Sequence, residues 1–327
     1  LRMARTVNTL PIHIGVGAHD QIQQTAVRWF DNVLTSIDDQ VPQDCSTLTL
    51  LEIKIMSGSC PFLYAWDGNS FRFVTDLLGG SPLGLRITDD HFIDSDPTEH
   101  VWIGDESIFP QKEGSYVIQI TEELREALYL DEVQLVVVDH PVNTEVHPID
   151  KLQFKPFPVS RLDTFEQLQL PIKAVRSDGL DVTQALNRID REVCSPVKLR
   201  QGQLRGLAEL FHVDLDFGEI GEDQDRHLIL TGWLQFGGGM ANVAASHYPN
   251  LPFPFPQLQA RTERGEWQPV DVFVGAPIGK TKTITVDLTG KLPEYTRHLR
   301  LSTGFEIHWD RIALMDSTPD SSLNQVT

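Results

Sequence analysis

The sequence predicts a mainly β protein, with antiparallel β domains, a C-terminal jelly-roll-like sandwich and few short helices. Runs that alternate apolar and polar residues, or that are rich in β-branched residues, outnumber runs with helical spacing, as is typical of strands. Glycine, proline and aspartate separate these runs, which favours sandwiches and barrels. The strand-like runs are Thr47–Ile55, Ser115–Ile120, Val133–Val138, Leu228–Leu234, Thr283–Leu288, His298–Thr303 and Phe305–Ile312.

Two segments favour helices. Asp181–Glu192 brings its apolar residues near one face, as an amphipathic helix does. Thr121–Leu128 starts with a capping residue followed by glutamates, which predicts one turn or a short helix. The order of these elements predicts a β segment over 1–55, a small β domain over 56–150, a mixed linker with one helix over 151–200 and a β-sandwich over 201–327.

Acidic residues dominate the charge of the chain. Asp and Glu total 46 against 27 Lys and Arg, giving a net charge of −19. Such a surface repels phosphate backbones and anionic headgroups, so we expect no nucleic-acid partner. No run approaches the ~20 apolar residues that cross a bilayer, so we expect no membrane insertion. The acidity suits a cationic or basic partner, or serves solubility alone.

Three cysteines are present, Cys45, Cys60 and Cys194. A disulfide between Cys45 and Cys60 is the natural pairing because both flank one strand pattern. A reduced, purely structural set of thiols is the alternative. No CxxC pair occurs, so the sequence predicts neither a zinc nor a redox site.

Two tryptophan motifs have a structural and a functional interpretation. Trp66-Asp67-Gly68-Asn69 predicts a tight hairpin, since Asp-Gly supplies the positive φ of the turn. Sugar stacking on Trp66 is the functional alternative. Near the C-terminus we expect Trp309 to pack in the core while Asp310 and Arg311 pair at the sheet edge.

The segment from Gly237 to Pro256 predicts a long surface loop. It contains three consecutive glycines and four prolines, which disfavour regular strands. Such a loop either binds a partner or covers an edge strand. The candidate binding residues are Gly237, Gly238, Gly239, His247, Tyr248, Phe253 and Phe255.

The stretch from Thr88 to His100 concentrates carboxylates and two histidines. Hard oxygen ligands at this density could hold Ca²⁺, although the order of an EF-hand loop is missing. A solvated acidic loop is the competing interpretation. The candidate ligands are Asp89, Asp90, Asp94, Asp96 and Glu99. No other cofactor is expected.

No pattern of catalytic residues stands out. The sequence has no G-x-S-x-G elbow and no HExxH, and the adjacent Glu122 and Glu123 do not establish the separated carboxylate pair of a glycosidase. We therefore expect no enzyme activity, with a hydrolase as the least favoured function.

The N-terminal segment resembles the closing part of the ASPIC/UnbV domain, which commonly follows FG-GAP propeller repeats in secreted bacterial proteins and in cartilage acidic protein. The similar residues are His13-Ile14-Gly15-Val16-Gly17, Val27-Arg28-Trp29 and Leu48-Thr49-Leu50-Leu51-Glu52. The remainder resembles C-terminal regions found after ASPIC/UnbV in bacterial proteins, on residues that include Cys60–Gly68, Phe73–Gly80, Glu122–Asp131 and Ile307–Ile312. Phe30-Asp31-Asn32 replaces the usual Pro-Ser/Asp-Gly. The resemblance implies a calcium-binding propeller before Leu1 and no settled reaction.

These observations together predict a non-catalytic interaction or assembly module, extracellular or periplasmic, that serves as an accessory subunit of a larger complex with protein partners. A carbohydrate-binding sandwich is the alternative. Its candidate stacking rings are Trp66, Trp102, Trp233, Trp267 and Tyr248.

Overall fold

The computed structural model divides the chain into two compact units, Leu1–Ser57 and Gly58–Thr327. It describes residues 12–15, 24–28, 34–38, 61–77, 82–87, 91–105, 107–122, 129–155, 161–220, 225–248, 251, 255–279, 281–316 and 324–326. The predicted Thr47–Ile55 strand, Cys45 and Cys60, and most of the predicted Thr121–Leu128 helix lie outside these residues. The predicted mainly β, antiparallel fold is confirmed.

Within the first unit, β1 (Gln24–Arg28) and β2 (Leu34–Asp38) form an antiparallel hairpin. Gln24 lies opposite Asp38 and Arg28 lies opposite Leu34. The hairpin falls inside the segment that was expected to be a β domain over 1–55.

A three-stranded sheet opens the second unit, with β3 (Phe62–Trp66) between β4 (Phe71–Asp76) and β5 (Ile118–Thr121). The predicted hairpin at Asp67-Gly68 joins β3 to β4. Gly68 has a φ of +100°, and the Asp67 carboxylate accepts the backbone N–H groups of Asn69 and Ser70 at 2.9 and 2.8 Å. Trp66 packs edge-on against Phe71 across the two strands, as paired aromatics on a hairpin do.

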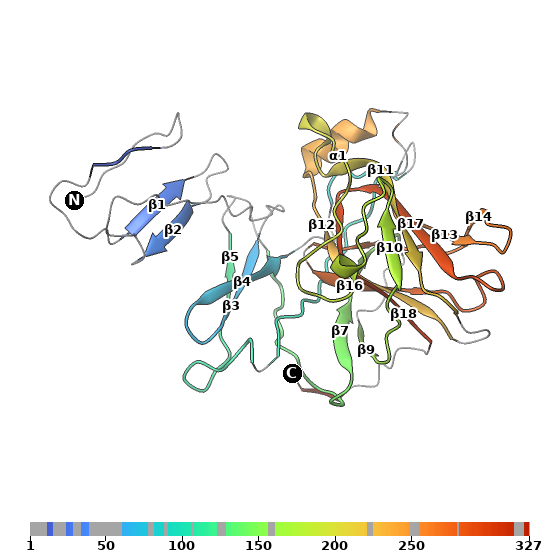
Figure 1. The fold of residues 1–327 in the computed structure, drawn as a ribbon. Coiled ribbons are helices and arrows are strands. Elements are labelled where there is room, and N and C mark those ends of the chain that lie inside the picture. The colour runs from blue at the N-terminus through green and yellow to red at the C-terminus, as the bar shows by residue number, and fades with distance from the viewer. Residues whose placement is uncertain are drawn as a thin grey trace. The chain divides into compact units, whose positions relative to one another are not determined.

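Two five-stranded sheets form the main body of the second unit (Figure 1). The first has the order β10-β11-β17-β13-β14 and is antiparallel throughout. Its strands are β10 (Lys173–Arg176), β11 (Leu207–Asp216), β13 (Gln257–Arg261), β14 (Trp267–Pro269) and β17 (His298–Phe305).

The second sheet has the order β18-β12-β16-β7-β9. Its strands are β7 (Glu145–Ile149), β9 (Arg161–Phe165), β12 (His227–Leu234), β16 (Lys282–Asp287) and β18 (Ile307–Met315). Only the contact of β16 with β7 is parallel. Gly232 of β12 lies opposite a bulge in β18 at Asp310, and glycine is required there because a Cβ would clash with the His308 carbonyl oxygen.

Short elements complete the described part of the chain. They are β6 (Val137–Asp139) paired with β19 (Asn324–Val326), β8 (Lys151–Leu152) paired with β15 (Ala276–Pro277), the 3₁₀ turns η1 (Gln184–Leu186) and η2 (Gly202–Leu204), and the helix α1 (Gly239–Ser246).

One core lies between the two large sheets. Alternate residues of each strand face it, because successive side chains of a strand point to opposite sides. Trp309 belongs to this core and is 1% exposed, which confirms its predicted packing role. Core residues from the two sheets include Val213, Leu215, Leu299 and Leu301 on one side, and Leu228, Leu230, Ile284, Val286, Ile312 and Leu314 on the other.

A single residue carries the chain from one sheet to the other between β17 and β18. β17 ends at Phe305 and β18 begins at Ile307, so Glu306 is the whole connection. Its backbone N–H donates to the Gly206 carbonyl at 3.1 Å, and its carbonyl accepts the Gln235 N–H at 2.9 Å. Both polar groups of this corner are therefore satisfied.

Two local predictions are wrong. Asp181–Glu192 forms the short 3₁₀ turn η1 instead of an amphipathic helix, because Val182 and Leu186 reach the core from a turn tied to β10 and β18. The predicted Gly237–Pro256 loop contains α1, which starts where the glycines end and good helix formers follow. The predicted linker over 151–200 also contributes β9 and β10 to the two sheets. The jelly-roll topology stays a prediction.

Neighbouring residues of β11 offer a matched test of this core. Phe211 is 2% exposed and Leu210 is 60% exposed. We expect Phe211→Ala to lower the free energy of unfolding by about 3–5 kcal/mol, because a large cavity forms. Leu210→Ala should change it by about 0.5 kcal/mol or less. Urea unfolding measures both, and equal effects would contradict the assigned faces of β11.

Candidate binding face

The outer side of the first sheet carries polar residues. Val213 and Leu215 of β11 face the core, so Asp214 and Asp216 face outward, and the register extends this alternation to the neighbouring strands. We call the outward-facing set the polar sheet face. It comprises Lys173, Val175, His212, Asp214, Asp216, Gln257, Gln259, Arg261, Trp267, Pro269, His298, Arg300 and Ser302.

An ion pair between neighbouring strands lies in the middle of this face. Arg300 of β17 is opposite Asp214 of β11, and its Nε and Nη2 donate to the two carboxylate oxygens at 2.6 and 2.8 Å. Such a bidentate pair fixes the plane of the guanidinium. His212 Nε2 lies 3.8 Å from Asp214 Oδ1. Burial lowers the pKa of His212, and Arg300 lowers it further.

Trp267 of the edge strand β14 is flanked by two guanidinium groups. The Arg300 guanidinium lies 4.2 Å from the centroid of the indole ring, and the Arg261 guanidinium lies 6.0 Å from it. Arg261 is itself oriented by a hydrogen bond from its Nε to the Gly265 carbonyl at 3.2 Å. Cations over an indole face are attracted by the ring quadrupole, so the three side chains hold one another in place.

A groove of about 450 Å³ adjoins the same face. Gln259 lines it and lies opposite both Arg300 and Pro269 in register, so the groove and the polar sheet face share residues. Its lining mixes apolar side chains with the amides of Gln257 and Gln259. The groove is lined by Phe255, Pro256, Gln257, Leu258, Gln259, Pro269, Val270, Val272 and Phe273.

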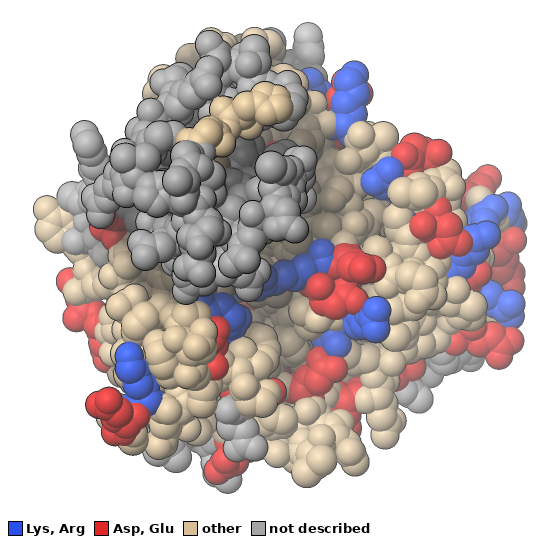
Figure 2. All heavy atoms as spheres, turned by 60° about the vertical axis from the view of Figure 1, so that its left-hand side comes forward, with Lys and Arg blue, Asp and Glu red and all other residues tan. Residues whose placement is uncertain are grey.

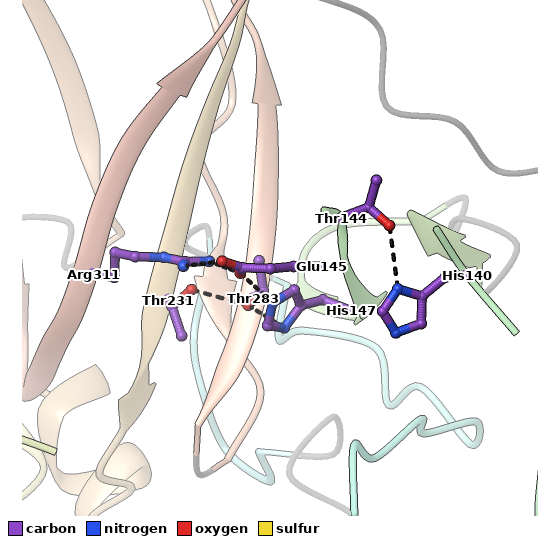
Figure 3. Close-up of polar contacts among 7 residues, drawn as sticks. All are labelled: His140, Thr144, Glu145, His147, Thr231, Thr283 and Arg311. Atoms are coloured by element: carbon purple, nitrogen blue, oxygen red, sulfur yellow. Dashed lines mark hydrogen bonds and ion pairs between the residues drawn. The ribbon is translucent and has the colours of Figure 1, made fainter. Parts of the chain in front are cut away.

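A second polar cluster occupies the outer side of the other sheet (Figure 3). Arg311 of β18 donates from Nη1 and Nη2 to the Glu145 carboxylate of β7 at 2.9 and 2.7 Å. His147 Nε2 lies 3.2 Å from Glu145, and His147 Nδ1 lies 3.2 Å from the Thr283 hydroxyl. Thr283 then pairs with Thr231 of β12 at 2.9 Å. The chain of contacts joins four strands.

This cluster shifts the ionisation of Glu145. The hydrogen bond from His147 and the ion pair with Arg311 lower the pKa of Glu145 to about 2, against the opposing effect of burial. The Arg311 side chain is 8% exposed while that of Glu145 is 47% exposed. The Glu145 carboxylate therefore neutralises the buried guanidinium of Arg311, so this ion pair has a structural role.

A serine and a histidine also meet, although the sequence places them far apart. Ser195 Oγ lies 2.9 Å from His308 Nδ1, and His308 Nε2 lies 3.7 Å from Glu306 Oε1. The indole of Trp233 stacks on the imidazole with the ring centroids 5.2 Å apart. None of these residues lines the groove beside the polar sheet face. Their contacts tie Ser195, which follows Cys194, to β18.

The predicted pairing of Asp310 with Arg311 is wrong. Arg311 pairs with Glu145, and Asp310 Oδ1 accepts the backbone N–H groups of Asp190 and Arg191 at 3.2 and 3.0 Å. Asp310 is fully buried, and burial raises the pKa of its carboxyl group. A bulge at Asp310 turns its side chain toward the neighbouring segment instead of along the sheet.

Two of the three predicted metal ligands that the structure describes pair with lysines. Asp94 lies 3.1 Å from Lys155, and Glu99 lies 3.0 Å from the buried Lys282. The Asp96 carboxylate accepts the Thr98 N–H at 3.0 Å. Among the described residues, no group of three His, Cys, Asp or Glu side chains is arranged to hold a metal ion. Asp89 and Asp90 lie outside those residues, and Ca²⁺ binding stays a prediction.

The predicted binding-loop residues are dispersed. A Cβ on Gly237 would lie 1.9 Å from the Arg205 carbonyl oxygen, so this glycine permits a close backbone approach. Gly239 begins α1 and His247 caps its C-terminal end, while Tyr248 is 49% exposed. Phe255 is 2% exposed and lines the groove. Gly238 precedes α1, and Phe253 lies outside the described residues.

The candidate stacking rings differ in exposure. Trp102 is 46% exposed, whereas Trp233 is 9% exposed. Trp66 is half-buried beneath Lys112, whose Nζ lies 4.0 Å from the ring centroid. Trp267 is also half-buried, and of these rings it is the one on the polar sheet face.

Comparisons with known proteins assign no family. No family model matches the chain, and no curated protein matches it. In the part of the chain that the structure describes, no helix is long and apolar enough to cross a membrane. The fold defines a sandwich-like, mainly β protein, and the ASPIC/UnbV resemblance stays a prediction.

Glu145 should give the stability of the protein a defined pH dependence. Its pKa falls from the ordinary 4.5 to about 2 on folding, so the stabilisation is present above pH 4.5 and is lost as the pH falls toward 2. Glu145→Gln should lower the free energy of unfolding at pH 7 by about 1–3 kcal/mol, because Arg311 loses its charged acceptor. Unfolding curves from pH 2 to 7 measure this; Glu266→Gln is the control, and a constant difference down to pH 2 would contradict the assignment.

Cys194 should be unreactive in the folded protein. Its thiol is 1% exposed, and burial raises its pKa to about 12, so thiolate is scarce at neutral pH. Peptide mapping after iodoacetamide treatment should find Cys194 unmodified in native protein and alkylated in urea. Rapid labelling of Cys194 in the native protein would contradict its burial beside Trp309 of β18.

Proposed function

We propose that this chain is a non-catalytic interaction module of an extracellular or periplasmic assembly, where it serves as an accessory subunit. The polar sheet face and the adjoining groove are its contact surface. A protein partner is the primary expectation. The extracellular or periplasmic setting follows from the ASPIC/UnbV resemblance of the sequence.

The observation that carries this proposal is the pre-ordered pairing of Trp267, Arg300 and Asp214 on an open sheet. Tryptophan and arginine contribute most to binding energy at interfaces, and ordered side chains lose less entropy on binding. Asp214 is 36% exposed in its side chain and Arg300 is 23% exposed, so both remain accessible. The groove beside them offers an apolar pocket for an anchoring side chain.

The openness of the face favours binding over chemistry. Catalysis depends on charges that develop in a site from which water is excluded. The polar sheet face is instead a broad surface. Its central carboxylate, Asp214, and its central guanidinium, Arg300, already neutralise each other. The Ser195–His308 contact is covered by Trp233 and serves the sheet edge.

Carbohydrate binding is a second candidate function, favoured by the indole ring of Trp267 and the amide of Gln259, which lies two residues from the Trp267 partner Arg261 on the same face. Aromatic rings suit the apolar faces of sugar rings, while amides supply hydrogen bonds to hydroxyl groups. Both candidate functions place the ligand on the polar sheet face, and the experiment below tests that placement.

A photo-crosslinking residue at position 259 tests the proposed contact surface. We expect it to capture a specific partner from the secreted and periplasmic proteins of the source cell. The same crosslinker at the exposed Gln184 should not capture it. The purified partner should then bind wild-type protein about tenfold more tightly than it binds Trp267→Ala.

Trp102→Ala is the matched control, since Trp102 is an exposed tryptophan outside the face. It should bind the partner as the wild type does. The proposal fails if crosslinking at both positions captures the same proteins, or if Trp267→Ala and Trp102→Ala bind alike. Near-identical circular dichroism of the variants excludes unfolding as the cause.

A further inference from the structure

We infer that Arg261, Trp267 and Arg300 form a site for anionic groups, and that its ligand is an acidic saccharide, a chain of sugars bearing carboxylates. The inference rests on the proposed function, because it names the ligand class of the same polar sheet face. Neither a carboxylate-binding site nor an acidic ligand was predicted from the sequence.

Arg300 and Arg261 both keep hydrogen-bond donors that an anionic ligand can use. Asp214 occupies the Nε and Nη2 edge of Arg300, so the Nη1 amino group keeps two N–H donors that no described residue accepts. Arg261 uses Nε for the Gly265 carbonyl, and its two terminal amino groups likewise have no acceptor among the described residues. Guanidinium donors of this kind match the two oxygens of a carboxylate.

The charge of the polar sheet face complements an anionic ligand. The polar sheet face carries three permanent cations, Lys173, Arg261 and Arg300, against the two carboxylates Asp214 and Asp216. The whole chain carries a net charge of −19, so this excess of positive charge is local. Acidic and basic groups are interspersed on the side of the molecule in Figure 2. An anionic ligand is therefore attracted to this face and repelled by most others.

The length and chemistry of the polar sheet face suit a short chain of sugars. Asp214, Arg300, Gln259 and Pro269 form one row across four strands, which at about 4.8 Å per strand spans about 14 Å. The indole ring stands beside this row, and Gln259 brings an amide to it. A short chain of sugar rings presents flat apolar faces, hydroxyl groups and carboxylates over such a length. An acidic peptide has the charge but not the flat rings.

Calorimetry on the full chain tests the inference with three probes at low salt and at physiological salt. They are an oligogalacturonate, a neutral cello-oligosaccharide of equal length, and poly-L-glutamate. We expect binding of the oligogalacturonate, with an affinity that falls as salt rises because exposed charges are screened. Neither of the other probes should bind comparably.

Variants of the three side chains locate the site. Arg261→Ala and Trp267→Ala should each weaken oligogalacturonate binding about tenfold, and Trp267→Phe should retain part of it. Arg300→Lys keeps the charge but loses the fork, so it should also weaken binding. Trp102→Ala is the control and should bind like the wild type.

The outcomes separate this inference from the proposed function. Equal affinity for the neutral oligosaccharide overturns the anionic preference, and stronger binding of poly-L-glutamate assigns the site to an acidic peptide instead. If no saccharide binds while a protein crosslinks at position 259, the inference fails and the interaction function stands. If neither binds, both fail.

Discussion

Burial of β12 on both of its faces is the constraint on which the rest of the sandwich depends. All eight of its residues are buried. Leu228 and Leu230 face the other sheet, while on the opposite side Ile229 packs in a second apolar cluster with residues of β7, β9 and β18, and Thr231 pairs with Thr283 of β16. A one-residue slip would exchange these two sets and place a threonine in the apolar core. The registers of β16 and β18, which pair with β12, are therefore fixed. The two polar clusters lie on opposite outer sides as a consequence.

Much of this architecture could be predicted from the sequence, since alternation along a strand is a local signal. The patterns of β12, β16, β17 and β18 predicted strands close to the observed bounds. The predicted helix over Asp181–Glu192 failed because helical spacing also arises when a turn sends two apolar residues into a core. Propensity is a weak guide when tertiary contacts supply most of the burial.

The candidate site could not be predicted in the same way, because its contacts join distant parts of the chain. Asp214 and Arg300 are 86 residues apart, and Glu145 and Arg311 are 166 apart. The sequence alone gives no sign that these side chains pair, because only the strand order brings them together. The acidic run near Asp94 and Glu99 shows the converse, since neighbours in sequence pair with separate lysines.

The one-residue corner at Glu306 couples the two sheets mechanically. β17, which carries Arg300, continues into β18, which carries Arg311, through this single residue. Inserting or deleting one residue at this corner would shift the alternation of one strand by one position. Its apolar side chains would then face water. Sequence length here is thus as constrained as any buried side chain.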